Sequence, residues 1–249
     1  MTMDSATTRD GFVAYDELEA PELDAALWSP LRLPQPTGGV HVPLDPAAEV
    51  TVAGGELRLT IPRFSLSHDT WQPADSAKYV MSSTGEFALP PDGSATFAVD
   101  LAIENLGGEP GDYRRGMAAF HVFAVDGSRP VFAVCGTSTR VLAMHEQLAP
   151  WGSAEPFNHV VESPYQDFDD DFTRLRECTV TLDRGASTAT WRVDGREVYR
   201  APGAVIPERV RLGIGIWTML SPRDGRSRSL EGQGISTRWR RFRVRGVEV

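Results

Sequence analysis

The sequence predicts an all-β protein, a single-domain antiparallel β-sandwich made of two sheets. Roughly twelve short runs alternate apolar and polar residues, turn residues separate them, and few stretches show helical periodicity. The clearest run ends at Asp194-Gly195, a preferred two-residue hairpin turn because both of its positions take positive φ at low cost. Trp191 and Val193 share one parity of the strand before this turn. We therefore expect Trp191 to lie in the core between the sheets.

The other strands are predicted one after another along the chain, each from its own pattern. A Gly54-Gly55 turn folds the segment 50–61 into a hairpin, and residues 96–103 alternate cleanly between apolar and polar. Asp126-Gly127 turns the segment 117–134 back on itself. Later strands are expected at 138–146, 179–182, 190–199, 210–220 and 236–244.

Length and composition fit one domain with a substantial core, since 41% of the 249 residues are apolar. No linker interrupts the strands, so we predict one domain over residues 12–249, after a disordered or loosely ordered tail at residues 1–11. The net charge of -9 argues against nucleic acid or a membrane as a partner. The expected partner is a small-molecule or glycan ligand, and the oligomeric state stays open.

The chain shows no targeting segment and no metal-binding pattern. Met1 to Tyr15 is polar, and no run approaches the about 18 apolar residues of a membrane span, so we expect a cytoplasmic protein. Cys135 and Cys178 lie far apart in strand-like runs, where buried free thiols are expected rather than a disulfide or a zinc site. No metal and no cofactor are predicted.

Five short segments occur in an order that resembles a known superfamily. They are Leu27-Trp28, 55–59, 190–198, 212–217 and 239–244. In this order they resemble the concanavalin A-like lectin/glucanase superfamily, which includes laminarinase-type glycosidases, legume lectins and laminin G-like modules. The resemblance implies a jelly roll of two curved sheets, with a ligand groove on the concave sheet.

The carboxylates of the glycosidases in this superfamily are missing. Laminarinase-like enzymes carry a Glu-x-Asp-x-x-Glu pattern on one strand, because paired carboxylates must flank the scissile bond. The nearest candidates here, Glu146 and Glu155, lie on either side of a proline, and Glu177 stands alone. Hydrolysis by such a pair is therefore not expected. The acidic run Asp167 to Asp171 offers oxygen ligands for calcium but lacks the spacing of a calcium loop, which favours a solvated loop and leaves calcium binding open.

The parity of the segment 210–220 predicts the floor of the groove. Leu212, Ile214 and Ile216 form an apolar row that belongs in the core. The opposite face then presents Gly213, Gly215, Trp217 and Met219 to the ligand. Glycines on a sheet face leave room for a ligand or another backbone, and the indole offers an apolar platform for a sugar ring or a polyene. The alternative is that a loop of this same protein covers Trp217.

Two histidines and one glutamate are the candidate catalytic groups. In the strand 138–146 we expect Leu142 and Met144 to face the core and His145 to face the groove, where an imidazole can transfer protons near neutral pH. His121 is a second candidate, although both parities around it are apolar. Glu146 should face away from His145 unless a bulge intervenes. Histidines that only fill the packing are the alternative for both.

Polar loops are expected to close the groove. They contribute the substrate-binding candidates Trp71, Lys78, Tyr113, Arg114, Arg115 and Trp151. Arg114 and Arg115 follow a turn and could clamp a carboxylate or an enolate in bidentate fashion. The alternative is that both arginines are simply solvated.

Three function classes fit these observations. The preferred hypothesis is a cofactor-independent cyclase, isomerase or lyase of bacterial specialised metabolism, in which a shaped apolar groove folds a natural-product substrate. The first alternative is a carbohydrate-binding or glycan-processing module without the usual hydrolase carboxylates. The second alternative is a non-catalytic interaction protein. The sequence names neither the substrate nor the reaction.

Overall fold

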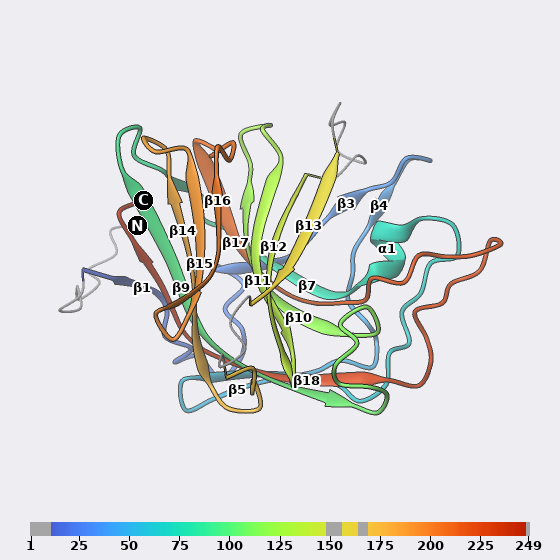
Figure 1. The fold of residues 1–249 in the computed structure, drawn as a ribbon. Coiled ribbons are helices and arrows are strands. Elements are labelled where there is room, and N and C mark those ends of the chain that lie inside the picture. Colours follow the sequence, from blue (N-terminus) through green and yellow to red (C-terminus); the bar gives the residue numbers. More distant parts are fainter. Residues whose placement is uncertain (1–10, 148–155, 164–168, 248–249) are drawn as a thin grey trace.

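The computed structural model describes residues 11–147, 156–163 and 169–247. Two eight-stranded antiparallel sheets pack face to face and form the predicted jelly-roll sandwich (Figure 1). The prediction of an all-β fold is therefore confirmed. The predicted tail at residues 1–11 lies outside the described residues, apart from Gly11.

The first sheet, sheet I, follows the order β16-β15-β14-β9-β18-β6-β5, and β1 pairs with β18 outside this path. Its strands are β16 (Arg196–Pro202), β15 (Thr188–Val193), β14 (Arg176–Asp183), β9 (Ser94–Leu106), β18 (Gly234–Arg245), β6 (Glu56–Ile61), β5 (Glu49–Ala53) and β1 (Val13–Asp16). Leu101 and Trp239 are register partners on β9 and β18 in the middle of this sheet, and both side chains are fully buried.

The second sheet, sheet II, follows the order β13-β12-β11-β10-β17-β7-β2, and β8 pairs with β17. Its strands are β13 (Phe157–Glu162), β12 (Arg140–Gln147), β11 (Pro130–Thr137), β10 (Met117–Ala124), β17 (Arg209–Trp217), β7 (Ala77–Ser83), β2 (Trp28–Pro30) and β8 (Phe87–Ala88). A short ribbon, β3 (Leu33–Pro34) and β4 (Val40–His41), and the one-turn helix α1 (Gln72–Ser76) lie near β7 (Figure 1). No helix in the described residues is long and apolar enough to cross a membrane.

On β15 and β17 the core between the sheets contains the residues that parity assigned to it. Trp191 is fully buried and lies 6.0 Å, ring centroid to ring centroid, from Phe132 of the opposite sheet. Leu212, Ile214 and Ile216 are fully buried in the same apolar cluster. Both predictions are confirmed, because one strand face of each segment is uniformly apolar and the other is not.

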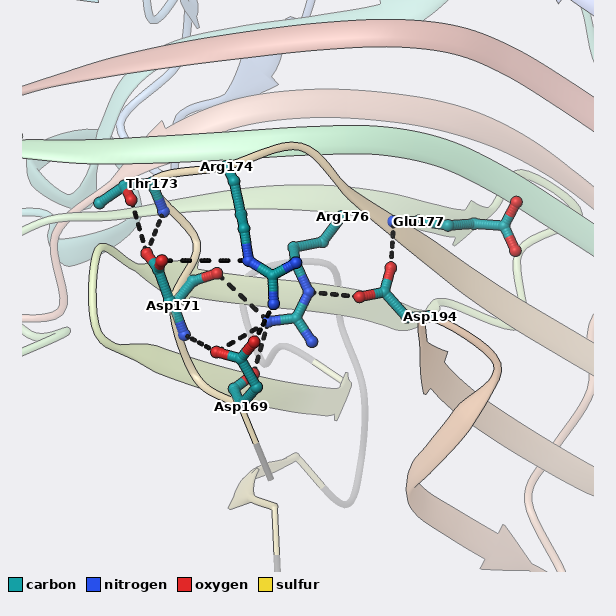
Figure 2. Close-up of polar contacts among 7 residues, drawn as sticks. All are labelled: Asp169, Asp171, Thr173, Arg174, Arg176, Glu177 and Asp194. Carbon is teal, nitrogen blue, oxygen red and sulfur yellow. Dashed lines mark hydrogen bonds and ion pairs between the residues drawn. The ribbon is translucent and has the colours of Figure 1, made fainter. Parts of the chain in front are cut away.

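The hairpin turn at Asp194-Gly195 is of the predicted type and also ties down a loop. Asp194 has φ 50° and Gly195 has φ 76°, the positive values of a type I′ turn. The Asp194 carboxylate accepts hydrogen bonds from the backbone N–H of Glu177 at 2.9 Å and from Nε of Arg176 at 2.5 Å (Figure 2). The turn residue therefore has a second function, because it neutralises a buried arginine.

Arg176 joins the turn to the acidic segment that precedes β14. Its side chain is 4% exposed, and Nη1 donates to the carbonyl oxygens of Asp169 at 2.5 Å and Asp171 at 3.2 Å. Arg174 forms an ion pair with the Asp169 carboxylate (Figure 2). The two carboxylates remain about half-exposed, and Asp167 lies outside the described residues. Among the described residues no group of three or more acidic, histidine or cysteine side chains is placed to hold a metal ion.

We expect Asp194→Ala to lower the free energy of unfolding by about 2 kcal/mol, because it removes hydrogen bonds to a charged group and leaves the buried Arg176 guanidinium without its carboxylate. Asp194→Asn keeps the positive φ and should lose about half as much. Urea denaturation measures both losses. Equal stability of the alanine variant and the wild type would contradict this account of the turn.

Candidate functional site

A groove with a volume of about 850 Å³ opens on the outer face of sheet II, away from sheet I. Its floor follows the strand register across the sheet, because residues paired between neighbouring strands point to the same face. One such row runs from Gly213 on β17 through His121 and Ala133 to Met144 on β12. The apolar lining consists of Leu31, Leu33, Val80, Met117, Phe123, Val131, Met144, Phe157, Trp217 and Met219.

Trp217 lines this groove, but the glycines beside it do not leave space for a ligand. A Cβ atom on Gly215 would lie 2.5 Å from the indole Nε1, and one on Gly213 would lie 3.1 Å from Cε1 of Phe123. The two glycines therefore make room for aromatic rings of this protein, which lie over the strand. The interpretation of the glycines as open space for a ligand is wrong, whereas the indole itself stays partly exposed in the groove.

Strand β12 points the other way from the sequence prediction. Val141 and Ala143 belong to the inter-sheet core, whereas Leu142 and Met144 belong to a separate cluster on the groove face. The prediction was wrong because both faces of this strand are apolar, so that alternation does not say which face is inside. His145 shares the parity of Val141, and its side chain consequently faces away from the groove.

His145 stacks on Phe132, with ring centroids 4.9 Å apart and an interplanar angle of 14°. Burial, with a smaller contribution from the neighbouring His159, lowers the pKa of His145 to about 4. A neutral imidazole stacked in this way is typical of a packing residue. The groove-facing position predicted for His145 is therefore wrong.

His121 and Glu146 do line the groove. His121 lies edge-on to Trp217, with ring centroids 5.4 Å apart, and is 5% exposed. Burial lowers its pKa to about 4, so the ring is neutral at neutral pH. Its Nδ1 and the Trp217 Nε1 are buried and have no hydrogen-bond partner in the described residues. His121, the second candidate, thus occupies the groove position that was expected for His145.

Glu146 carries the carboxyl group of the groove floor. It faces away from His145, as predicted, and its side chain is 8% exposed. Its Oε2 accepts a hydrogen bond of 2.9 Å from Nδ2 of Asn158 on the edge strand β13. Burial raises the pKa of Glu146 to about 7, so that a large fraction carries a proton at neutral pH.

Lys78 does not line the groove. Its side chain is buried and donates hydrogen bonds to three separate segments of the protein. It is fully buried, and its Nζ donates to the carbonyl oxygens of Leu66 and Asp75 at 2.6 Å and to Oγ of Ser229 at 2.7 Å. Burial lowers its pKa to about 8. The expectation of a substrate-binding lysine is wrong, because all three of its protons are used by the protein itself.

The other described loop candidates do not line the groove, although two of them pack against residues that do. Trp71 packs in one cluster with Trp217, and Tyr113 in another with Trp217 and Met219. Arg114 and Arg115 do not line the groove, and Asp112 pairs with both, at 2.9 Å and 3.3 Å. The expected anion clamp is therefore occupied by an internal carboxylate. Trp151 lies outside the described residues.

Sequence reasoning missed several residues of the groove. Phe123 shares the parity of His121 and could have been found from that spacing. Asn158 and Phe157 belong to β13, a strand in a segment read as loop because it is polar and aromatic. Arg129 reaches the groove from the turn before β11 with φ 74°, a conformation that no sequence signal announces.

Residues 24–248 match the model of a family described as a family of unknown function (DUF6081). The chain belongs to this family. No curated protein sequence matches this DUF6081 member.

Solved structures of glucanases share the fold. LamAcat from Zobellia galactanivorans is 12% identical, with a TM-score of 0.57 over 92% of this chain and 95% of that one. An endo-1,3-beta-glucanase from Streptomyces sioyaensis is 13% identical, with a TM-score of 0.56 over 97% and 99% of the two chains. A beta-glucanase from Bacillus licheniformis is 13% identical, with a TM-score of 0.54 over 96% and 99%. At these identities the likeness establishes the concanavalin A-like fold of the DUF6081 member, and the predicted resemblance is confirmed.

Proposed function

We propose that the groove of sheet II binds carbohydrate and that the protein is a carbohydrate-binding or glycan-processing protein. The observation that carries the proposal is the partly exposed indole of Trp217 on the floor of an open groove that also contains hydrogen-bonding side chains. An aromatic face accommodates the apolar face of a sugar ring, while Glu146, Asn158 and Gln147 can serve its hydroxyl groups. The glucanases that share the fold support the same ligand class, since one of them is described in complex with laminaritriose and laminaritetraose.

The proposal does not include hydrolysis by a pair of carboxylates. Retaining glycosidases hold two carboxyl groups about 5 Å apart across the bond that they cleave. Among the described residues that line the groove, Glu146 supplies the carboxyl group. The groove-facing positions of the neighbouring strand β11 are Val131, Ala133 and Cys135, which have no acidic side chain.

A second candidate is a cofactor-independent cyclase or isomerase that acts on an apolar substrate in the cytoplasm. The observation that favours it is the apolar floor, which contains Met117, Met144 and Met219. Methionine side chains adapt to irregular apolar ligands. Catalysis in such a site would depend on holding the substrate in a reactive conformation.

Calorimetric titration with laminarioligosaccharides and with a neutral polycyclic hydrocarbon separates the two candidates. We expect saturable oligosaccharide binding, and we expect Trp217→Ala to weaken it about fivefold because a ring contact of about 1 kcal/mol is lost. Val50→Ala, on the edge strand β5 of the other sheet, is the matched control and should leave the affinity unchanged. Binding of the hydrocarbon alone would favour the second candidate, and binding of neither ligand would leave a non-catalytic interaction protein.

A further inference from the structure

Glu146 occupies a position that has the features of a built ligand contact. It extends from β12, beside the edge strand of sheet II, between Val131 of β11 and Asn158 of β13, its register partners on either side. The side chain is more than nine-tenths buried and still borders the groove. A carboxyl group held at an apolar surface in this way costs free energy unless it is protonated or paired.

The hydrogen bond with Asn158 assigns different tasks to the two carboxyl oxygens. Nδ2 of Asn158 is a donor, so the Oε2 that it contacts is the acceptor. Within the described residues, the carboxyl group of Glu146 makes this hydrogen bond through Oε2. The proton of the acid form therefore resides on Oε1, where it is available to a ligand.

The groups that surround Glu146 do not stabilise its charge. Cys135 faces the groove from β11 as a neutral thiol, because burial raises its pKa well above the usual value. His121 contributes a neutral imidazole from β10. Besides Arg32, the cation Arg129 borders the same groove, from the turn before β11. Burial raises the pKa of Glu146 to about 7 in spite of that arginine.

We propose that Glu146 is a specificity-determining residue that donates a hydrogen bond from its protonated carboxyl group to a neutral oxygen of the ligand, a hydroxyl, ether or carbonyl oxygen, and rejects carboxylates. The inference rests on the proposed function only in placing the ligand in the groove. A neutral sugar satisfies it, and so does an apolar alcohol. An anionic ligand is disfavoured, because its charge must leave water for a poorly solvated place and would meet a second negative charge whenever Glu146 is ionised.

The test compares two probes of equal shape, 2-naphthalenemethanol and 2-naphthoate, together with laminaritriose, at pH 6 and pH 8.5. For the wild type we expect the alcohol to bind about tenfold more weakly at pH 8.5, because the carboxyl group loses its proton across this range. Glu146→Gln keeps a donor at all pH values, so its affinity for the alcohol should be independent of pH. Glu162→Gln, on the neighbouring edge strand β13 but outside the groove, is the matched control and should behave as the wild type.

The outcomes separate this inference from the proposed function. Tight alcohol binding that depends on pH, with no binding of laminaritriose, would support the role of Glu146 and overturn the carbohydrate proposal. Laminaritriose binding with the same affinity at both pH values would support the carbohydrate proposal and overturn the role of Glu146. Preference for 2-naphthoate over the alcohol, or an unchanged pH dependence in Glu146→Gln, would also overturn it. Failure of every probe to bind would overturn both.

Discussion

Lys78→Ala is expected to lower the free energy of unfolding by about 3–5 kcal/mol, the largest single effect that we anticipate in this protein. The ammonium group joins three acceptors on separate segments: the carbonyl oxygen of Leu66, the carbonyl oxygen of Asp75 in α1, and Oγ of Ser229. Its removal takes the charged donor from all three acceptors, and an unpaired buried group costs about 1–3 kcal/mol. Chemical denaturation monitored by tryptophan fluorescence measures the loss.

Two further variants test whether the hydrogen bonds or the volume of Lys78 matter. Lys78→Met keeps most of the volume, and we expect it to recover no more than about 1 kcal/mol of the loss, because it supplies no donor. Ser229→Ala removes one acceptor of the three and should cost about 1 kcal/mol. If Lys78→Met were as stable as the wild type, the loops would be held by packing alone.

The second large effect is a change of stability with pH that Glu146→Gln isolates. The pKa of Glu146 rises from about 4.5 in the unfolded chain to about 7 in the folded protein. The folded state therefore binds more protons between these values, and the contribution of this group to stability is fully present below pH 4.5 and is lost as the pH rises to 7. The loss amounts to about 3 kcal/mol. Glu146→Gln should thus gain about 3 kcal/mol relative to the wild type between these pH values.

His121 changes the stability with pH in the opposite direction, over nearly the same pH range. Its pKa falls from 6.5 to about 4 on folding, so the unfolded chain binds more protons, and stability is present above pH 6.5 and lost as the pH falls to 4. His145, whose pKa is also lowered to about 4, adds to this loss, so Glu146 offsets only part of it in the wild type, and Glu146→Gln exposes the acid loss in full. Urea denaturation in steps of one pH unit measures both. A pH-independent difference between Glu146→Gln and the wild type would contradict the burial of this carboxyl group.

The sequence predicted the elements whose two faces differ in polarity. Trp191 and the Leu212 row were placed correctly because their neighbours on the other parity are polar or glycine. Strand β12 offers no such contrast, since Val141, Leu142 and Met144 follow one another closely, and its orientation depends on the strands beside it. Glu146 could have indicated the orientation of β12, because an ionisable group lies on the accessible face of a strand more often than in the core between two sheets.

The remaining errors concern contacts between distant segments. Lys78 lies in a polar stretch that resembles a surface loop, and its burial depends on Ser229, which is 151 residues away. The Trp217 indole lies over Gly215, two residues away in the same strand. Whether the glycine leaves space for a ligand or for this indole depends on the side-chain rotamer of Trp217. Hydrophobic periodicity predicts neither a partner that is distant in sequence nor a side-chain rotamer.

The strands that form one end of the groove are close together in the sequence, whereas those that form the other end are far apart. The Glu146 end is made of four strands, β10 to β13, that follow one another as a meander. The Trp217 end joins β17 to β7 and β2, segments separated by more than half of the polypeptide. Local hairpins form early and distant pairings late, so the indole reaches its place only when β17 has paired with β7. The residues that line the groove span most of the chain, from Leu31 to Met219, so a complete groove indicates that both halves of sheet II have assembled.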